Sequence, residues 1–236
     1  MKAICNVSVA PLRKEPSEKV EMVTQMLFGE SCDILEEQKY WTKVKMHYDG
    51  YEGWTDTQQI SVMTEEDLAK RTFSVVMKTV GMYDLQQGNT LLSIGSEVFT
   101  KNPEPLIKGT RESISSTARL FLNVPYLWSG RSFFGVDCSG FVQLVYKVHG
   151  ISLPRESALQ AEIGEVLSFV EESKPGDLAF FENEEGQICH VGIMVNHQEI
   201  IHAFGKVRID SLDSTGIFNK DLKKHTHKLR FLRSIF

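Results

Sequence analysis

The chain has 236 residues, 42% of them hydrophobic and 24% charged, with a formal net charge of -5. This composition is typical of a globular protein, and the length allows one large domain or two modest ones with separate cores. The sequence contains no basic stripe with interleaved aromatic residues and its pI is about 5.8. We therefore expect no nucleic-acid partner.

Membrane and targeting signals are absent from the sequence. No run of about 18 apolar residues occurs, so we expect no membrane span and no membrane partner. Near the start, Asn6 and Ser8 interrupt the apolar run that a secretory signal needs. If this is the native start, the expected location is cytoplasmic, although a chain trimmed of its signal would look the same.

Four cysteines are scattered along the chain without a C-x-x-C pair, namely Cys5, Cys32, Cys138 and Cys189. The pattern favours free thiols in a reducing compartment over a zinc site or a disulfide framework. For Cys5, Cys32 and Cys189 we expect the ordinary role of a small buried hydrophobic residue.

The N-terminal part of the chain is expected to form short β-strands separated by turns. Within Trp41–Met46, polar and apolar residues alternate from Lys43 onward, as a half-buried strand requires, and Asp49-Gly50 makes a tight turn into the next strand. Other strands are predicted over Ile4–Val9, Met22–Leu27, Cys32–Leu35 and Tyr51–Thr55. A capped helical turn is predicted over Thr64–Lys70, and further strands between Val75 and Phe99. This spacing predicts a small β-barrel.

The domain boundary is predicted at Asn102-Pro103-Glu104-Pro105, because two prolines so close together stop any element. It divides the chain into residues 1–105, with extension and linker, and residues 106–236. A helix is predicted from Ser113 until Pro125, and strands follow over 177–181, 190–195 and 200–204. The second domain is therefore α+β.

The segment Gly135–Gly150 carries the candidate nucleophile. Its apolar residues mark one face of a helix, Asp137 stands where an N-cap belongs, and Cys138 falls in the first turn. Unpaired backbone N–H groups and the positive end of the helix dipole favour a thiolate there and lower its pKa. The alternative is that Cys138 only packs beneath the start of the helix.

Two histidines are the candidate partners of this thiol, since a thiol nucleophile needs a base that titrates near neutral pH. His190 opens one predicted strand and His202 closes the next, with Asn196–Glu199 between them. A hairpin centred on Asn196 would set His190 directly opposite His202 on one face of the sheet. His202 would then fix the tautomer of His190 and aim its other nitrogen at Cys138. The remaining histidines are interpreted as surface or turn residues: His47, His149, His197, His225 and His227.

At this point both halves of the chain resemble known families. Asp137–Val142, Lys174–Phe181, His190–Ile193 and Ile201–Ala203 resemble the NlpC/P60 cysteine peptidases, over roughly residues 109–236. Leu12-Arg13 with Pro16, Gly29-Glu30, Trp41 with Val44, and Gly50–Trp54 resemble the bacterial SH3-like domains that accompany cell-wall enzymes. The resemblance implies an α+β protein with an N-terminal SH3-like β-barrel followed by a papain-like NlpC/P60 catalytic domain.

The resemblance also implies a reaction. Proteins that pair these domains are typically γ-D-glutamyl-L-diamino-acid endopeptidases, which cleave murein peptides with a free N-terminal L-Ala, as in cell-wall peptide recycling. Cys138 would attack the γ-carbonyl of D-Glu, His190 would protonate the leaving amine, and water would clear the thioester. No metal or organic cofactor is required. A monomer is favoured.

Further site residues follow from the same resemblance. The hydroxyl of Tyr126 would help polarise the scissile carbonyl, and Asp137, Ser139 and Ser157 would contact the substrate. Asp137 also has a reading as a plain helix cap. From the SH3-like domain, Tyr51 and Glu21 are the candidates to face the substrate ammonium, although Tyr51 could equally be a core residue of the barrel.

Two other functions stay open at this stage. One is a different amidase or acyltransferase that uses the same Cys–His pair. The other is a non-catalytic protein whose two domains only bind wall peptide.

Overall fold

The computed structural model describes residues 1–86 and 88–236. Its internal contacts divide the chain into two units: residues 1–107 with 128–134, and residues 108–127 with 135–236. The predicted boundary after residue 105 lies just before the first break. The segment Trp128–Phe134, which the sequence analysis placed in the second domain, belongs to the first unit.

The first unit is built around an antiparallel sheet with the strand order β3-β2-β6-β5-β4-β1-β7. Its strands are β1 (Lys2–Cys5), β2 (Val9–Arg13), β3 (Met22–Leu27), β4 (Ser31–Glu37), β5 (Trp41–Met46), β6 (Glu52–Asp56) and β7 (Ile60–Met63), with a 3-10 turn over Thr57–Gln59. Within β5, Val44 and Met46 are buried, as the alternation predicts. The core under this sheet also contains Cys5 and Cys32, which confirms that these two cysteines act as buried hydrophobic residues.

One predicted strand, Ile4–Val9, is wrong, because the chain bends at Asn6–Ser8 between β1 and β2. The bend changes the pairing partners: β1 pairs with β4 and β7, whereas β2 pairs with β3 and β6. The rest of the first unit comprises α1 (Glu65–Lys70), β8 (Phe73–Val75) paired with β11 (Glu97–Phe99), β9 (Val80–Leu85) paired with β10 (Gly88–Ser93), and β12 (Arg131–Ser132).

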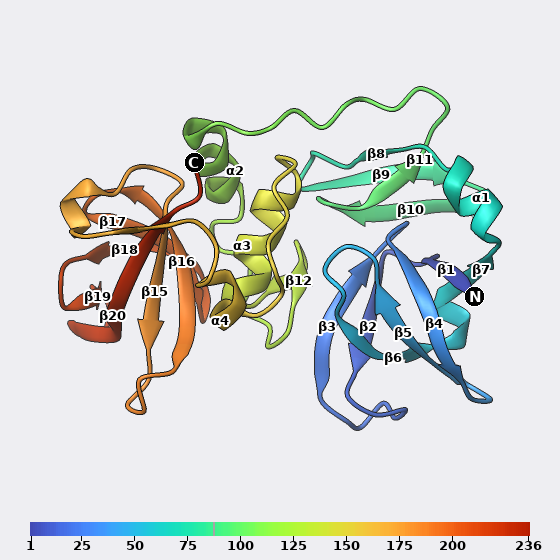
Figure 1. Cartoon of the computed structure of the whole chain (residues 1–236), viewed down its shortest axis with the longest axis horizontal. Coiled ribbons are helices and arrows are strands. Elements are labelled where there is room, and N and C mark those ends of the chain that lie inside the picture. Colours follow the sequence, from blue (N-terminus) through green and yellow to red (C-terminus); the bar gives the residue numbers. More distant parts are fainter. Residues whose placement is uncertain (87) are drawn as a thin grey trace. The chain divides into compact units, whose positions relative to one another are not determined.

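The second unit contains a sheet with the strand order β14-β20-β15-β16-β17-β18-β19, and β20 also pairs with β19 (Figure 1). Because β20 pairs on both sides, the strands from β15 to β20 close on themselves as a barrel. Their bounds are β14 (Glu165–Leu167), β15 (Leu178–Glu182), β16 (Ile188–Asn196), β17 (Glu199–Phe204), β18 (Lys206–Leu212), β19 (Gly216–Asn219) and β20 (Lys224–Ser234). Apolar side chains such as Phe181, Met194 and Ile217 form the core of this barrel.

Helices and short strands complete the second unit: α2 (Arg111–Leu120), β13 (Gly135–Val136), α3 (Cys138–Lys147), α4 (Ser157–Gln160) and a 3-10 turn over Val170–Glu172. Helix α3 packs against β16 and β17. The edge-to-face contact of Phe121 and Phe141, with 5.5 Å between ring centroids, fixes the chain after α2 against α3. The start of α3 is therefore held close to the strands that carry the candidate histidines.

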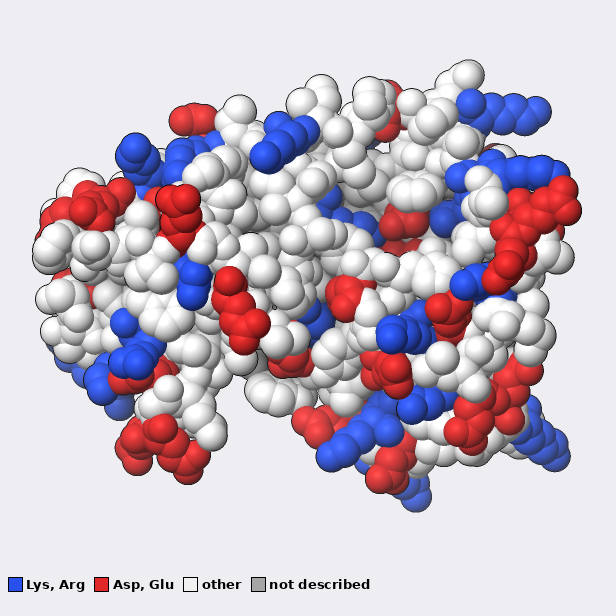
Figure 2. All heavy atoms as spheres, in the orientation of Figure 1, with Lys and Arg blue, Asp and Glu red and all other residues white. Residues whose placement is uncertain are grey.

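Charged side chains of both signs are interspersed on the face shown in Figure 2. None of the helices in residues 1–86 and 88–236 has the length and apolar character needed to cross a lipid bilayer.

Candidate active site

Cys138 is the first residue of α3, and Asp137 is its N-cap, as the sequence predicts. The Asp137 carboxylate accepts a hydrogen bond of 2.6 Å from the backbone N–H of Gly140. This bond satisfies one of the donors that a helix start leaves unpaired, and it fixes the turn that presents Cys138.

The carboxylate of Asp137 is also bound by Arg155, which the sequence analysis did not single out. Arg155 donates to both oxygens of Asp137, over 2.6 and 3.1 Å, and to the hydroxyl of Ser139 over 2.9 Å. All three residues are buried. Their network positions the nucleophile turn, and the predicted substrate contacts of Asp137 and Ser139 stay predictions.

The electrostatic surroundings of Cys138 differ from the sequence expectation. Burial, followed by the negative charge of Asp137, raises the pKa of the thiol to about 12, which outweighs the lowering by the backbone N–H of Val191 and by Arg155. The helix start alone therefore does not hold a thiolate here, and a base must remove the proton. The hydrogen bond to Val191 also locates the sulfur beside the residue that follows His190.

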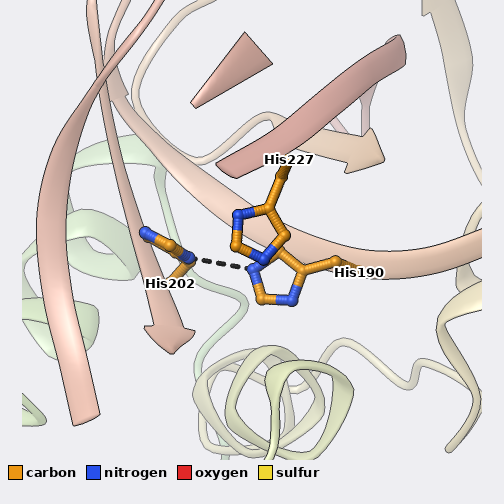
Figure 3. A group of neighbouring side chains, drawn as sticks. All are labelled: His190, His202 and His227. Carbon is orange, nitrogen blue, oxygen red and sulfur yellow. Dashed lines mark hydrogen bonds between the residues drawn. The ribbon is translucent and has the colours of Figure 1, made fainter. Parts of the chain in front are cut away.

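The hairpin of β16 and β17 brings His190 and His202 into contact through a register that the sequence analysis got wrong. The turn is tighter than predicted, with Asn196 opposite Glu199, and the pairing has an irregularity between Met194 and Asn196. As a result, Gly192 and not His190 lies opposite His202. His190 is therefore two residues along β16 from the position opposite His202. Both side chains still lie on the same face of the sheet, where diagonal neighbours are in contact. His190 Nε2 and His202 Nδ1 are 2.9 Å apart (Figure 3).

A carboxylate extends this pair into a relay. His202 Nε2 lies 3.1 Å from Oδ2 of Asp210 on β18, and Arg208 donates to both oxygens of the same carboxylate, over 2.6 and 2.8 Å. Burial raises the pKa of Asp210, but the hydrogen bonds from His202 and Arg208 outweigh it and lower that pKa to about 2. Asp210 is therefore ionised and can only accept hydrogen bonds.

This ionised acceptor assigns the tautomers of both imidazoles. Burial lowers the pKa of His202, and burial with the neighbouring histidines lowers the pKa of His190 well below its ordinary value, so both rings are neutral at pH 7. His202 then donates from Nε2 to Asp210 and accepts at Nδ1 from Nε2 of His190. The proton-free nitrogen of His190 is Nδ1, on the ring edge away from His202 (Figure 3), and it is available as a base.

Tyr126 follows a bend before β13 and is half-buried. Its backbone forms a parallel bridge with Val136, just ahead of the nucleophile turn. Burial, with smaller contributions from Cys138 and Asp137, raises the pKa of Tyr126 to about 12. Its hydroxyl therefore stays protonated and can donate a hydrogen bond, which is what an oxyanion requires.

His227 is a member of the cluster that sequence reasoning missed, and its interpretation as a surface or turn residue is wrong. It lies on β20, stacked on His190 with 4.2 Å between ring centroids and 24° between planes. Burial and the neighbouring His202 lower its pKa to about 4. His149 lies in the turn after α3, as one of the two interpretations has it, and it is buried there, with Nε2 2.8 Å from the Thr117 hydroxyl.

The remaining predicted residues lie as follows. Ser157 is the first residue of α4 and is half-buried. In the first unit, Glu21 accepts a hydrogen bond of 2.7 Å from the indole of Trp128, and Tyr51 is half-buried after the turn at Asp49. Their roles toward substrate stay predictions. The expectation of a buried Cys189 is wrong, because that thiol is exposed.

A thiol at a helix start, beside a strand whose histidine is oriented by a second polar residue, defines the site of a Cys–His hydrolase. Comparison with known proteins makes this class specific. Residues 123–227 match the model of the NlpC/P60 family, and residues 12–60 match the bacterial dipeptidyl-peptidase Sh3 domain.

Relatives with assigned names extend the match to most of the chain. The gamma-D-glutamyl-L-lysine dipeptidyl-peptidase of Bacillus subtilis (strain 168) is 32% identical, with 84% of this chain and 78% of that protein covered. The protein of the same name from Bacillus cereus is 27% identical over 78% of this chain and 67% of its own length. The chain belongs to the NlpC/P60 family of peptidases.

A solved structure supports the fold. The crystal structure of an NlpC/P60 family protein from Bacillus cereus superposes with a TM-score of 0.85, at 21% identity, over 100% of this chain and 99% of the other. The predicted α+β fold, an SH3-like β domain followed by an NlpC/P60 catalytic domain, is confirmed.

Proposed function

We propose that the chain is a cysteine endopeptidase that hydrolyses the γ-D-glutamyl-L-diamino acid bond of cell-wall peptides with a free N-terminal L-Ala. The relay from His190 through His202 to Asp210, beside the thiol that begins α3, is the observation that carries the chemistry. The bond follows from the two relatives named as gamma-D-glutamyl-L-lysine dipeptidyl-peptidases.

The reaction begins with a neutral thiol and a neutral imidazole. Nδ1 of His190 takes the proton of Cys138 as the sulfur attacks the γ-carbonyl carbon of D-Glu. The positive charge that forms on His190 is stabilised through His202 by the ionised Asp210, which accepts from His202 over 3.1 Å. The tautomers of the relay thus prepare the base before substrate arrives.

The oxyanion of the tetrahedral intermediate needs donors fixed in advance. The protonated hydroxyl of Tyr126 and the backbone N–H groups at the start of α3 would supply them. His190 then returns its proton to the leaving amine of the diamino acid. Water, deprotonated by the same nitrogen, hydrolyses the thioester and releases the acyl fragment with its new carboxylate.

A peptide panel tests the proposed bond. The purified chain would be incubated with L-Ala-γ-D-Glu-L-Lys, with the meso-diaminopimelate counterpart, and with the N-acetylated form of each peptide, and products would be identified by mass spectrometry. We expect release of L-Ala-D-Glu from the free peptides, little turnover of the acetylated ones, and no turnover by Cys138→Ala. Cleavage at the L-Ala bond, or equal turnover of acetylated peptides, would contradict the proposal.

A different assignment within the class would show in the same panel. Retained peptide binding by Cys138→Ala, measured by calorimetry, together with lost hydrolysis would exclude the interpretation of the chain as a binding protein. Transfer of the acyl fragment to an added amine in preference to water would indicate an acyltransferase.

A further inference from the structure

Three histidines of the second unit gather from separate strands at one point (Figure 3). His190 lies on β16, His202 on β17 and His227 on β20, and each offers a ring nitrogen such that the three nitrogens all lie within 4.8 Å of one another. The reaction proposed above uses two of these rings. It gives no role to His227, whose Nδ1 lies 2.9 Å from the hydroxyl of Thr226.

We propose that His190, His202 and His227 form a site that binds a zinc ion reversibly, and that the bound ion inhibits the peptidase. Three imidazole nitrogens with water in the fourth position are a common tetrahedral environment for zinc. Two nitrogens bound to one zinc ion at 2.0–2.1 Å stand roughly 3.3 Å apart. His190 Nε2 and His202 Nδ1 are 2.9 Å apart, so these two nitrogens must separate slightly. The ring of His227, now stacked on His190, must also rotate to direct a nitrogen at the ion.

The surroundings determine which nitrogen of two of the rings is free to bind a metal ion. Asp210 accepts from Nε2 of His202, which leaves Nδ1 of that ring bare and directed into the cluster. A carboxylate behind a histidine in this way is the usual support of a zinc-bound imidazole. The Nδ1 atom of His227 lies 2.9 Å from the hydroxyl of Thr226, which leaves Nε2 as the ligand atom of that ring.

Inhibition follows from the tautomer of His190. With zinc on Nε2, a neutral imidazole must carry its single proton on Nδ1, so the proton moves from one nitrogen to the other within the same ring. Nδ1 then has no lone pair to accept the proton of Cys138. The zinc ion would therefore stop the first step without touching the thiol, and its removal would restore the base. This inhibitory half rests on the proposed function, whereas zinc binding does not.

A titration with zinc alone tests the site directly. Zinc would be titrated by calorimetry into the full chain carrying Cys138→Ser and Cys189→Ser, which removes the two accessible thiols as rival ligands. We expect one zinc ion per chain. His227→Phe and His227→Gln should each weaken binding by at least about tenfold, since each removes one nitrogen. His225→Ala is the matched control, because His225 lies on the same strand but pairs with Asp213 outside the cluster, and it should bind zinc as the parent does.

Either of two results would refute the proposal: no zinc binding by the folded parent, or equal affinity for zinc in the parent and in both folded His227 variants. Cobalt supplies a second probe in the chain with its native thiols. A tetrahedral cobalt spectrum without sulfur-to-metal charge transfer supports the three-histidine site, and a charge-transfer band shows that a thiol, Cys138 or Cys189, binds the metal instead.

Activity is measured separately. Zinc should inhibit peptide hydrolysis, excess chelator should restore it, and each His227 variant should need at least about ten times more zinc for the same fractional inhibition. If the chelator-treated chain hydrolyses no peptide, the proposed function fails while the calorimetric result still decides the zinc site. If hydrolysis is normal but insensitive to zinc, the inhibitory site is refuted and the peptidase stands.

Discussion

Each unit of the molecule buries a charged network, and the two networks differ in what they leave unpaired. In the first unit, Arg131 is fully buried and donates to both oxygens of Glu30, each over 2.8 Å. In the second unit, Asp210 is equally buried but its hydrogen bonds pass through His202 to His190. In the ion pair, both carboxylate oxygens of Glu30 accept from Arg131. The relay, in contrast, ends at Nδ1 of His190, whose lone pair can accept a proton.

The difference separates a structural network from a reactive one. Arg131 keeps its positive charge at ordinary pH, and its bidentate pair with Glu30 holds Trp128–Phe134 in the first unit. Imidazole rings, by contrast, can change tautomer and can gain or lose a proton near neutral pH. In the second network, burial keeps His190 unprotonated, so that it can accept a proton.

The largest effect is expected from His190→Ala, which removes the end of the relay. Loss of the base should lower kcat/KM by about 10⁴-fold, because general acid–base catalysis contributes up to that factor. The change in the free energy of unfolding should be much smaller than the loss of transition-state stabilisation that this fall in kcat/KM represents. Steady-state kinetics and urea unfolding measure both, with His225→Ala as the control, and a loss below about tenfold would remove His190 from the mechanism.

Breaking the closed pair should affect stability. Arg131→Met leaves Glu30 buried without its partner, and we expect a loss of about 3–5 kcal/mol in the free energy of unfolding. Adding Glu30→Leu should recover much of that loss, because the uncompensated charge disappears. Chemical denaturation of the two variants checks this, and equal stability of the single and double variants would contradict it.

Asp210→Asn should have an intermediate effect on rate. The amide can donate as well as accept, so it no longer forces the proton of His202 onto Nε2. Because Asp210 acts on His190 through another ring, we expect kcat to fall by about 10–100-fold, with KM little changed. An unchanged kcat would show that the relay ends at His202.

The smallest effect concerns pH and distinguishes the two networks by titration. His227 has a folded pKa of about 4, below its unfolded value of about 6.5, so the unfolded chain binds more protons between these values. Stability due to this group is present above pH 6.5 and is lost as the pH falls toward 4. For one such group the loss between pH 7 and pH 5 is about 2 kcal/mol. Denaturation with chelator present should show it in the native chain, and His227→Phe should reduce it, whereas an unchanged pH dependence would refute it.

Local signals were sufficient to predict the nucleophile turn. Asp137 before Cys138 and an apolar helical face define α3 almost to the residue, because capping and amphipathic spacing depend on near neighbours only. The contact between His190 and His202 was also predictable. Its register was not, since one tighter turn and one irregularity shift the pairing by two residues while keeping the same face.

Residues brought in by distant strands could not be predicted from such signals. His227 lies on β20, where Lys224, Lys228 and Arg230 obscure the apolar alternation of a strand. Its position beside His190 depends on the closure of the barrel, which is a long-range pairing. A local signal existed for Asp210, because it lies on β18, the strand that follows His202 after a short turn at Gly205 and pairs with β17. No comparable pattern in the sequence around Arg155 predicts that this residue is buried beside Asp137.

The account rests on Cys138 as the nucleophile that the relay activates, and trapping the acyl-enzyme tests this most directly. The chain would be mixed with excess L-Ala-γ-D-Glu-L-Lys, quenched in acid within a single turnover and mapped by peptide mass spectrometry. The account predicts the mass of the L-Ala-D-Glu acyl group on the peptide that contains Cys138, and no adduct in His190→Ala. An acyl group on another residue, or full hydrolysis by Cys138→Ala, would contradict it.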